Sequence, residues 1–263
     1  MAVIFGLLGI VNFAHGALYM IGAYVTWGAF DSFEINYWWS LFLAPLMVGV
    51  LGVVIERLML RHLYKLDPLY GLLLTFGLAL IAEGLFRYQF GVSGQRYEVP
   101  ELLQGATDVG FMVLPNYRAW VIVASLSVCL GTWFLIERTK LGSYLRAGTE
   151  NARLVQAFGV NVPLLVMFTY GAGAALAGFA GVLAAPVVQI SPLMGSNLII
   201  VVFAVVVIGG MGSIMGAIVT GIGLGVIEGF TKVFYPEASN VVVFVIMVIV
   251  LVFRPAGLFG KEA

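Results

Sequence analysis

Residues 163–185 read PLLVMFTYGAGAALAGFAGVLAA, a stretch of 23 residues without a charged side chain. About 20 apolar residues in a helix span the roughly 30 Å hydrocarbon core of a bilayer. The stretch is apolar throughout, whereas a strand of a membrane β-barrel alternates between apolar and polar residues over about ten positions. We therefore predict a membrane-spanning helix here.

Apolar runs of similar character lie on both sides of this stretch and are bounded by charged or turn residues. They cover residues 2–11, 14–30, 38–55, 69–86, 119–137, 197–210, 213–230 and 239–253. The first is short and has neither a cationic leader nor a small-residue cleavage site, so we expect a truncated membrane helix and not a signal peptide. The pattern predicts an all-α fold: a single transmembrane domain, residues 1–263, forming a polytopic helical bundle of about eight transmembrane helices.

The composition supports a membrane protein and excludes several other classes. Charged residues make up 10% of the chain, against about 25% in a typical soluble domain, and the mean hydropathy is +1.06. The formal net charge is +0, so no basic or acidic tract points to nucleic acid. Cys129 is the only cysteine, and no cluster of Cys and His has metal-ligand spacing, so we expect neither redox nor metal chemistry.

The distribution of Lys and Arg predicts the orientation in the membrane. Residues 56–68, residues 138–162 and the tail from 254 carry nine of these residues, and the alternate connections carry four. Because short cytoplasmic loops are enriched in Lys and Arg, the first set should face the cytoplasm. The alternation requires a cytoplasmic turn at residues 209–213. It leaves residues 87–117, rich in Gly and Pro, as an extracytoplasmic loop large enough to dock a partner.

Glycine is frequent, with 33 residues, and several glycines recur at a spacing of four within the apolar runs. The sets are Gly212 and Gly216; Gly221, Gly225 and Gly229; and Gly173, Ala177 and Gly181. Small residues at this spacing allow helix backbones to approach closely in lipid. Two interpretations stay open, namely static tight packing and smooth surfaces along which helices slide during a transport cycle.

The connection at residues 138–162 predicts one short amphipathic helix. Thr149 is a suitable N-cap, Glu150 suits the positive end of the helix dipole, and Gly159 can close the helix. The apolar face of this helix consists of Ala152, Val155 and Phe158. That face lies on lipid or on the chain itself, or it enters a groove of a partner protein.

Polar residues within the apolar runs are rare, because an ionised side chain at the bilayer centre costs at least ~2.5 kcal/mol. Asn12, His15 and Gly16 lie at the junction of the first two runs. They suit a helix break or cap, or the lining of a substrate path. Glu83 and Glu228 lie near the ends of runs, where we expect them to reach the membrane interface.

No enzymatic motif in the chain is convincing. The GxxxxGK[ST] pattern of P-loop ATPases is absent from the sequence, so any ATP hydrolysis would occur on another subunit. Residues 91–94, GVSG, resemble an intramembrane serine protease motif, but both histidines precede it and a serine nucleophile needs a nearby base. We expect a transport protein. An ion-coupled secondary transporter, which would need an acidic residue at mid-membrane, and a non-transporting scaffold are the alternatives.

Several separated motifs resemble the LivH-type permease subunit of bacterial branched-chain amino-acid ABC importers. They are residues 6–24 (GLLGIVNFAHGALYMIGAY), 146–162 (RAGTENARLVQAFGVNV), 209–216 (GGMGSIMG) and 254–260 (RPAGLFG). Together they span almost the whole chain. Family members usually carry further residues before the stretch that matches Ala2 to Ile10, so the resemblance again implies a truncated first helix.

The resemblance implies a multi-pass subunit of the bacterial inner membrane that moves branched-chain or other apolar amino acids from an extracytoplasmic binding protein to the cytoplasm. Related systems carry urea or short amides, so the substrate class stays open. The implied partners are a second, related permease, the binding protein and two cytoplasmic ATPases, which would hold ATP and Mg. The helix near residue 150 then corresponds to the coupling helix of ABC permeases. The residues assigned to ATPase coupling are Glu150, Asn151, Ala152, Val155, Phe158 and Gly159.

Overall fold

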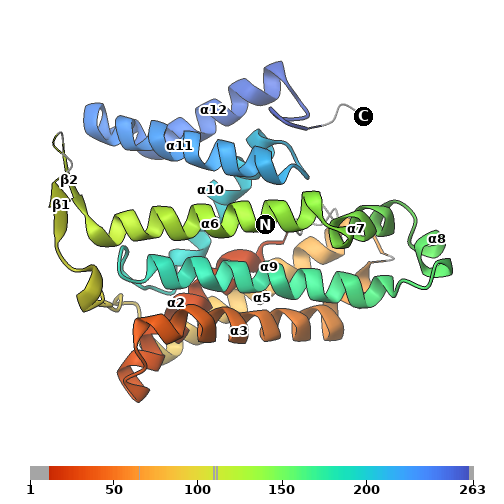
Figure 1. The fold of residues 1–263 in the computed structure, drawn as a ribbon, viewed down its shortest axis with the longest axis horizontal. Coiled ribbons are helices and arrows are strands. Elements are labelled where there is room, and N and C mark those ends of the chain that lie inside the picture. The colour runs from red at the N-terminus through yellow and green to blue at the C-terminus, as the bar shows by residue number, and fades with distance from the viewer. Residues whose placement is uncertain (1–11, 65, 109, 111, 261–263) are drawn as a thin grey trace.

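The computed structural model describes residues 12–260 except residues 65, 109 and 111, and it is a bundle of helices (Figure 1). The predicted run at residues 2–11 lies outside the described residues. Each of the remaining eight apolar runs coincides with a helix. These helices are α2 (Ala14–Phe33), α3 (Tyr37–Ile55), α5 (Pro68–Phe90), α6 (Asn116–Arg138), α9 (Val162–Ala184), α10 (Met194–Gly209), α11 (Ile214–Phe234) and α12 (Ser239–Phe253).

Five of the described helices are long and apolar enough to cross a membrane. They are α5, α6, α9, α11 and the continuous helix Tyr37–Leu63. The last consists of α3, the π-helical turn η1 (Glu56–Leu60) and α4 (Arg61–Leu63). α10 and the Val241–Phe253 part of α12 are apolar but shorter. The prediction of a helical, multi-pass membrane protein is confirmed.

The predicted loop at residues 56–68 is shorter than expected. The chain stays helical through Leu63, and Asp67 caps the next helix by accepting a hydrogen bond from the Leu69 amide at 2.9 Å. The connection is therefore confined to residues 64–67, because the π-helical turn lets the apolar helix run on without a break.

α9 forms the centre of the bundle and packs along α2 and α3 through small residues. A Cβ atom on Gly22 of α2 would lie 2.6 Å from the Cα atom of Gly178, so the two backbones are in direct contact. The predicted packing set on α9, Gly173, Ala177 and Gly181, is buried. Other helices of the same chain, α2 and α3, cover this face of α9.

The two predicted glycine sets on the C-terminal side differ from each other. Gly212 lies in the turn between α10 and α11 with φ +96, a conformation that glycine adopts readily, so it is a turn residue and not part of a helical pair. Gly216 packs against α10, since a Cβ atom on Gly209 would lie 2.7 Å from the Gly216 carbonyl carbon.

The second set, Gly221, Gly225 and Gly229, is open. Cβ atoms on Gly225 and Gly229 would meet no atom of the described chain within 4 Å, and one on Gly221 would meet only Val205, at 3.6 Å. Gly225 and Gly229 therefore have no packing partner within the described part of the chain.

The predicted extracytoplasmic loop at residues 87–117 is partly helical. α5 runs to Phe90 and α6 begins at Asn116, so the irregular segment is residues 91–115. It contains the 3₁₀ turn η2 (Glu101–Leu103) and an antiparallel hairpin, β1 (Ala106–Asp108) and β2 (Val113–Pro115), which the all-α prediction did not include. The hairpin lies at the opposite end of the molecule from α7 (Lys140–Glu150) and α8 (Ala152–Ala157), as Figure 1 shows.

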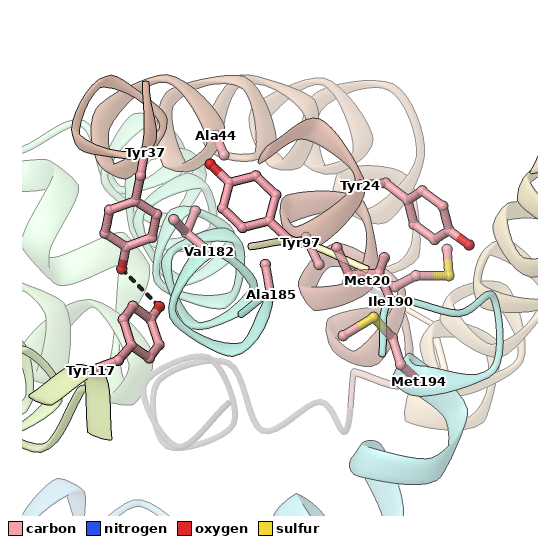
Figure 2. Close-up of a cluster of buried hydrophobic side chains, with 11 residues drawn as sticks. Met20, Tyr24, Tyr37, Ala44, Tyr97, Tyr117, Val182, Ala185, Ile190 and Met194 are labelled. Carbon is pink, nitrogen blue, oxygen red and sulfur yellow. Dashed lines mark hydrogen bonds between the residues drawn. The ribbon is translucent and has the colours of Figure 1, made fainter. Parts of the chain in front are cut away.

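A cluster of buried side chains closes the hairpin end of the bundle (Figure 2). Tyr97 of the irregular segment packs with Tyr37 and with residues of α2 and α9. Burial raises the pKa of Tyr97 to about 12. A backbone pair, Gln95 with Ile190, ties the same segment to the connection between α9 and α10. The irregular segment is thus fixed to the helices next to it.

Candidate functional site

The first described turn of α2 is buried and capped by side chains. Asn12 is 1% exposed, its side-chain oxygen accepts from the Ala14 amide at 3.0 Å, and its amide nitrogen donates to the Tyr170 hydroxyl at 2.8 Å. The Phe13 amide donates to the Thr75 hydroxyl at 3.2 Å. α2 therefore begins inside the bundle, where Asn12 satisfies the Ala14 amide, Thr75 of α5 satisfies the Phe13 amide, and Tyr170 of α9 holds the Asn12 side chain. The capping role that the sequence suggested for Asn12 agrees with this geometry.

Gly16 and His15 are also buried in packing contacts. A Cβ atom on Gly16 would lie 2.9 Å from the carbonyl carbon of Gly195, so α2 and α10 touch backbone to backbone at this point. His15 is 7% exposed. Of the three residues predicted to line a substrate path, Asn12 and Gly16 thus hold α2 against its neighbours, and His15 is buried beside them.

A cavity of about 210 Å³ lies directly beside these residues, between α2, α5 and α10. We call it the α2–α5–α10 cavity. Its lining includes neither Asn12, His15 nor Gly16, but their neighbours Phe13 and Ala17. The volume is roughly seven times the share of one water molecule in liquid, so a small organic molecule fits.

The α5 side of the cavity is one helical face. Phe76, Ala79, Leu80 and Glu83 line it at positions i, i+3, i+4 and i+7. Leu80 is 52% exposed whereas Met20, on the α2 side, is 1% exposed. The cavity therefore opens at the surface of the chain beside α5 and ends against α2.

Glu83 provides the only ionisable side chain among the residues that line this cavity. Its carboxylate accepts from the Ser196 hydroxyl of α10 at 2.6 Å and from the Arg87 guanidinium at 2.8 Å. The contact with Ser196 directs the Glu83 carboxylate toward α10. The position of Glu83 at the membrane interface stays a prediction. Glu228, by contrast, forms an exposed pair with Lys232 at 2.6 Å on α11.

A second buried carboxylate was not identified from the sequence. Glu56 is 2% exposed in η1 and accepts from the Tyr64 hydroxyl at 3.2 Å. Tyr64 follows the helix, where burial and the neighbouring Glu56 carboxylate raise the pKa of its hydroxyl. The Tyr64 hydroxyl thus remains a hydrogen-bond donor at physiological pH. In the sequence Glu56 is simply the first charged residue after an apolar run, and no periodicity marks it as buried.

The predicted coupling helix divides into two helices. Thr149 and Glu150 end α7, and Asn151, with φ −147, separates it from α8. The side chain of Asn151 caps α8 by accepting from the Leu154 amide at 3.0 Å, so the predicted cap at Thr149 is wrong. An amide acceptor at this position competes with helix continuation, which explains the break. Gly159, with φ +84, closes the C-terminus as predicted.

The exposed face of α8 also differs from the predicted one. Val155 is 8% exposed, so it packs against its own chain, whereas Phe158 is 81% and Leu154 57% exposed. Leu154 and Phe158 are four residues apart and share a face. The apolar face available to a partner therefore consists of Leu154 and Phe158, and Ala152 is exposed beside it.

α7 is anchored to α6. Arg146 donates to the Ile136 carbonyl at 3.0 Å, and a Cβ atom on Gly142 would lie 2.9 Å from the Ile136 Cα atom. α7 and α8 thus follow α6 as two separate short helices at this end of the molecule (Figure 1). Within residues 12–260, apart from the gaps, no group of three or more His, Cys, Asp or Glu side chains could hold a metal ion.

Comparison with known proteins identifies relatives along nearly the whole chain. The family described as "Branched-chain amino acid transport system / permease component" matches residues 1–251. The high-affinity branched-chain amino acid transport system permease protein BraD of Pseudomonas aeruginosa is 30% identical over 98% of this chain and 88% of its own length. LivH of Escherichia coli K12, with the same description, is 28% identical over 98% and 88%.

A more distant relative covers about half of the chain. The probable branched-chain amino acid transport permease protein LivM of Methanocaldococcus jannaschii is 29% identical over 54% of this chain and 41% of its own length. No solved structure matches the chain significantly.

Proposed function

Since this chain belongs to the family of branched-chain amino acid transport system permease components, we propose that it is the membrane-spanning subunit of an ATP-driven importer of branched-chain or other apolar amino acids. Substrate would pass from an extracytoplasmic binding protein to the cytoplasm. The observation that carries this proposal is the family match over residues 1–251, on a chain whose described helices coincide with the apolar runs. The names of the relatives favour it over a urea or amide importer and over an ion-coupled transporter.

The chain would be one permease domain of about eight spans in the bacterial inner membrane. α2, α10 and α12 would cross in addition to the five longer helices. Residues 138–162 would be the cytoplasmic coupling loop, and residues 87–117 would face the binding protein. The positions of the hairpin and of α7 and α8 at opposite ends of the molecule support this orientation (Figure 1).

The ATPases would be separate subunits that bind ATP and Mg, because the sequence has no P-loop. α8 would dock in a groove of an ATPase through Leu154 and Phe158, whose exposure suits a helix-in-groove contact. Movement of the ATPase would reach the membrane helices through α7, which is fixed to α6 by Arg146 and Gly142.

A second, related permease would complete the membrane part. The open glycine face of α11, with Gly225 and Gly229, can accept a close helix from such a partner. The similarity to both LivH and LivM proteins is consistent with a pair of related permeases.

The test is transport by the complete system. The chain, its second permease, the ATPases and the binding protein are reconstituted in proteoliposomes, and uptake of radiolabelled L-leucine is measured with and without ATP. We expect uptake that requires both ATP and the binding protein. Leucine uptake without ATP, driven by an ion gradient, would overturn the proposal.

A further inference from the structure

The α2–α5–α10 cavity combines an apolar wall with a single carboxylate at one edge. Phe13, Ala17 and Met20 supply the α2 wall, and Ala79 and Leu80 continue it on α5. At the rim, the Glu83 carboxylate meets the Ser196 hydroxyl at 2.6 Å and the Arg87 guanidinium at 2.8 Å. Such an environment suits a ligand with an apolar body and a charged end.

We propose that Glu83 and Arg87, with Ser196, bind the ammonium and carboxylate groups of a neutral amino acid whose aliphatic side chain fills the α2–α5–α10 cavity. The proposal rests on the transport function proposed above and assigns the residues that recognise the substrate in this chain.

The hydrogen-bonding capacity of the three residues is not exhausted by their mutual contacts. A carboxylate offers about four acceptor positions, and Glu83 uses two of them within the described chain. The Arg87 guanidinium has five N–H donors, one of which is bonded to Glu83. An ammonium group can therefore join Glu83, and a carboxylate can join Arg87, without the loss of an existing bond.

The spacing of the charged pair orients the ligand. Arg87 lies one helical turn beyond Glu83, about 6 Å along α5, and its side chain is 46% exposed against 16% for Glu83. The ligand carboxylate would therefore lie toward the exposed side, at Arg87, and the aliphatic side chain would point toward Ala79 and Phe76. Leu80, 52% exposed, and Ile200, 54% exposed, border the opening through which it would enter.

The pair of Glu83 and Arg87 differs from an ordinary ion pair within one helix, as a second pair in this chain shows. Glu228 and Lys232 on α11 have the same i, i+4 spacing and a 2.6 Å contact. That pair has no contact to another helix among the described hydrogen bonds and borders none of the described cavities. Glu83 differs through its bond across to Ser196 on α10 and its place on a cavity wall.

The first experiment uses the complete reconstituted system with Glu83→Gln and, as a matched control, Glu228→Gln. We expect Glu83→Gln to lower L-leucine uptake about tenfold or more, as for loss of a hydrogen bond to a charged group, while binding-protein-stimulated ATP hydrolysis persists. Glu228→Gln should transport within twofold of the unchanged chain. Unchanged uptake with Glu83→Gln overturns this assignment alone, whereas no ATP-dependent uptake by the unchanged chain overturns the proposed function.

The second experiment does not depend on folding of the Glu83 variant. Ile200→Cys is introduced in a Cys129→Ser background, and its reaction with a small methanethiosulfonate reagent is followed in the purified complex. L-leucine should slow the reaction, whereas 4-methylpentanoate, which has the same aliphatic group but no ammonium, should not. Equal protection by both compounds, or protection by neither, overturns the assignment.

Discussion

The hydroxyl oxygens of Tyr37 and Tyr117 lie 3.0 Å apart in the buried cluster at the hairpin end of the bundle (Figure 2). The direction of this hydrogen bond follows from its neighbours. Tyr117 donates its single proton to the Leu183 carbonyl at 3.0 Å, so Tyr37 must donate to Tyr117. Trp120 in turn donates to Tyr37 at 3.3 Å. The chain of bonds ends on a carbonyl in the last turn of α9, where no helical partner is available.

This direction makes Tyr117 more important for stability than Tyr37. Tyr117→Phe leaves the Tyr37 O–H without an acceptor and the Leu183 carbonyl without a donor, at about 1–3 kcal/mol for each buried group. Tyr37→Phe leaves only the Trp120 N–H unpaired. We expect a larger fall in Tm for Tyr117→Phe, at about 2–4 °C per kcal/mol, measured on purified protein in detergent. Tyr88→Phe, at a 91% exposed position, is the control, and equal Tm values for both buried variants would contradict the order of the bonds.

The orientation can be tested at two strongly exposed positions. Val92 is 76% exposed near the hairpin end and Phe158 is 81% exposed on α8. Each is replaced by cysteine in a Cys129→Ser background, and intact cells are treated with an impermeant thiol reagent. We expect labelling at position 92 in intact cells and at position 158 only after permeabilisation. The reverse pattern would invert the proposed topology.

Phe158→Asp should detach the ATPases. The substitution would place an unpaired charge in an apolar contact, which costs several kcal/mol when the charge is buried. We expect a normally inserted chain from which the ATPases no longer co-purify. Arg153→Gln, an exposed polar position on the same helix, should retain them. Full co-purification and uptake with Phe158→Asp would mean that α8 does not carry the coupling.

Ala152→Asp distinguishes between the two candidate contact faces of α8. The sequence predicted Ala152, Val155 and Phe158, whereas the structure exposes Leu154 and Phe158. Ala152 is exposed at the start of α8, beside the face formed by Leu154 and Phe158. We expect Ala152→Asp to weaken ATPase co-purification less than Phe158→Asp does, because its side chain borders the contact and does not fill its centre. A stronger effect at Ala152 would restore the face predicted from the sequence.

Two glycine substitutions should affect the isolated chain differently: Gly22→Ala should disrupt its fold, and Gly225→Leu should not. Gly22→Ala would place a Cβ atom 2.6 Å from the Gly178 Cα atom, and we expect a large loss of folded protein. A Cβ atom on Gly225 would meet no atom of the described chain within 4 Å, so with Gly225→Leu the isolated chain should stay folded while pairing with the second permease weakens. The measurement is size-exclusion chromatography of the chain alone and with its partner. Unimpaired pairing with Gly225→Leu would indicate that this face contacts lipid.

The sequence by itself determined the class of protein and the positions of its helices. Continuous apolar runs such as residues 163–185 can satisfy their backbone groups in lipid only as helices, so their length and boundaries predict the elements directly. Local signals gave a mixed result, because the predicted cap at Thr149 is wrong and Asn151 caps α8 instead. Gly159 closes α8 because a positive φ suits glycine, and the family motifs are read from the residues themselves.

Only the tertiary structure decided which residues face one another. Nothing in the sequence around Glu83 or Glu56 shows what the carboxylate contacts. The contact of Glu83 depends on the rotation of α5 against α10, and the burial of Glu56 depends on the π-helical turn η1. The same is true of the glycine sets. Identical spacing gives backbone contact at Gly181 and an open surface at Gly225, since a spacing fixes a helical face but not what packs against it.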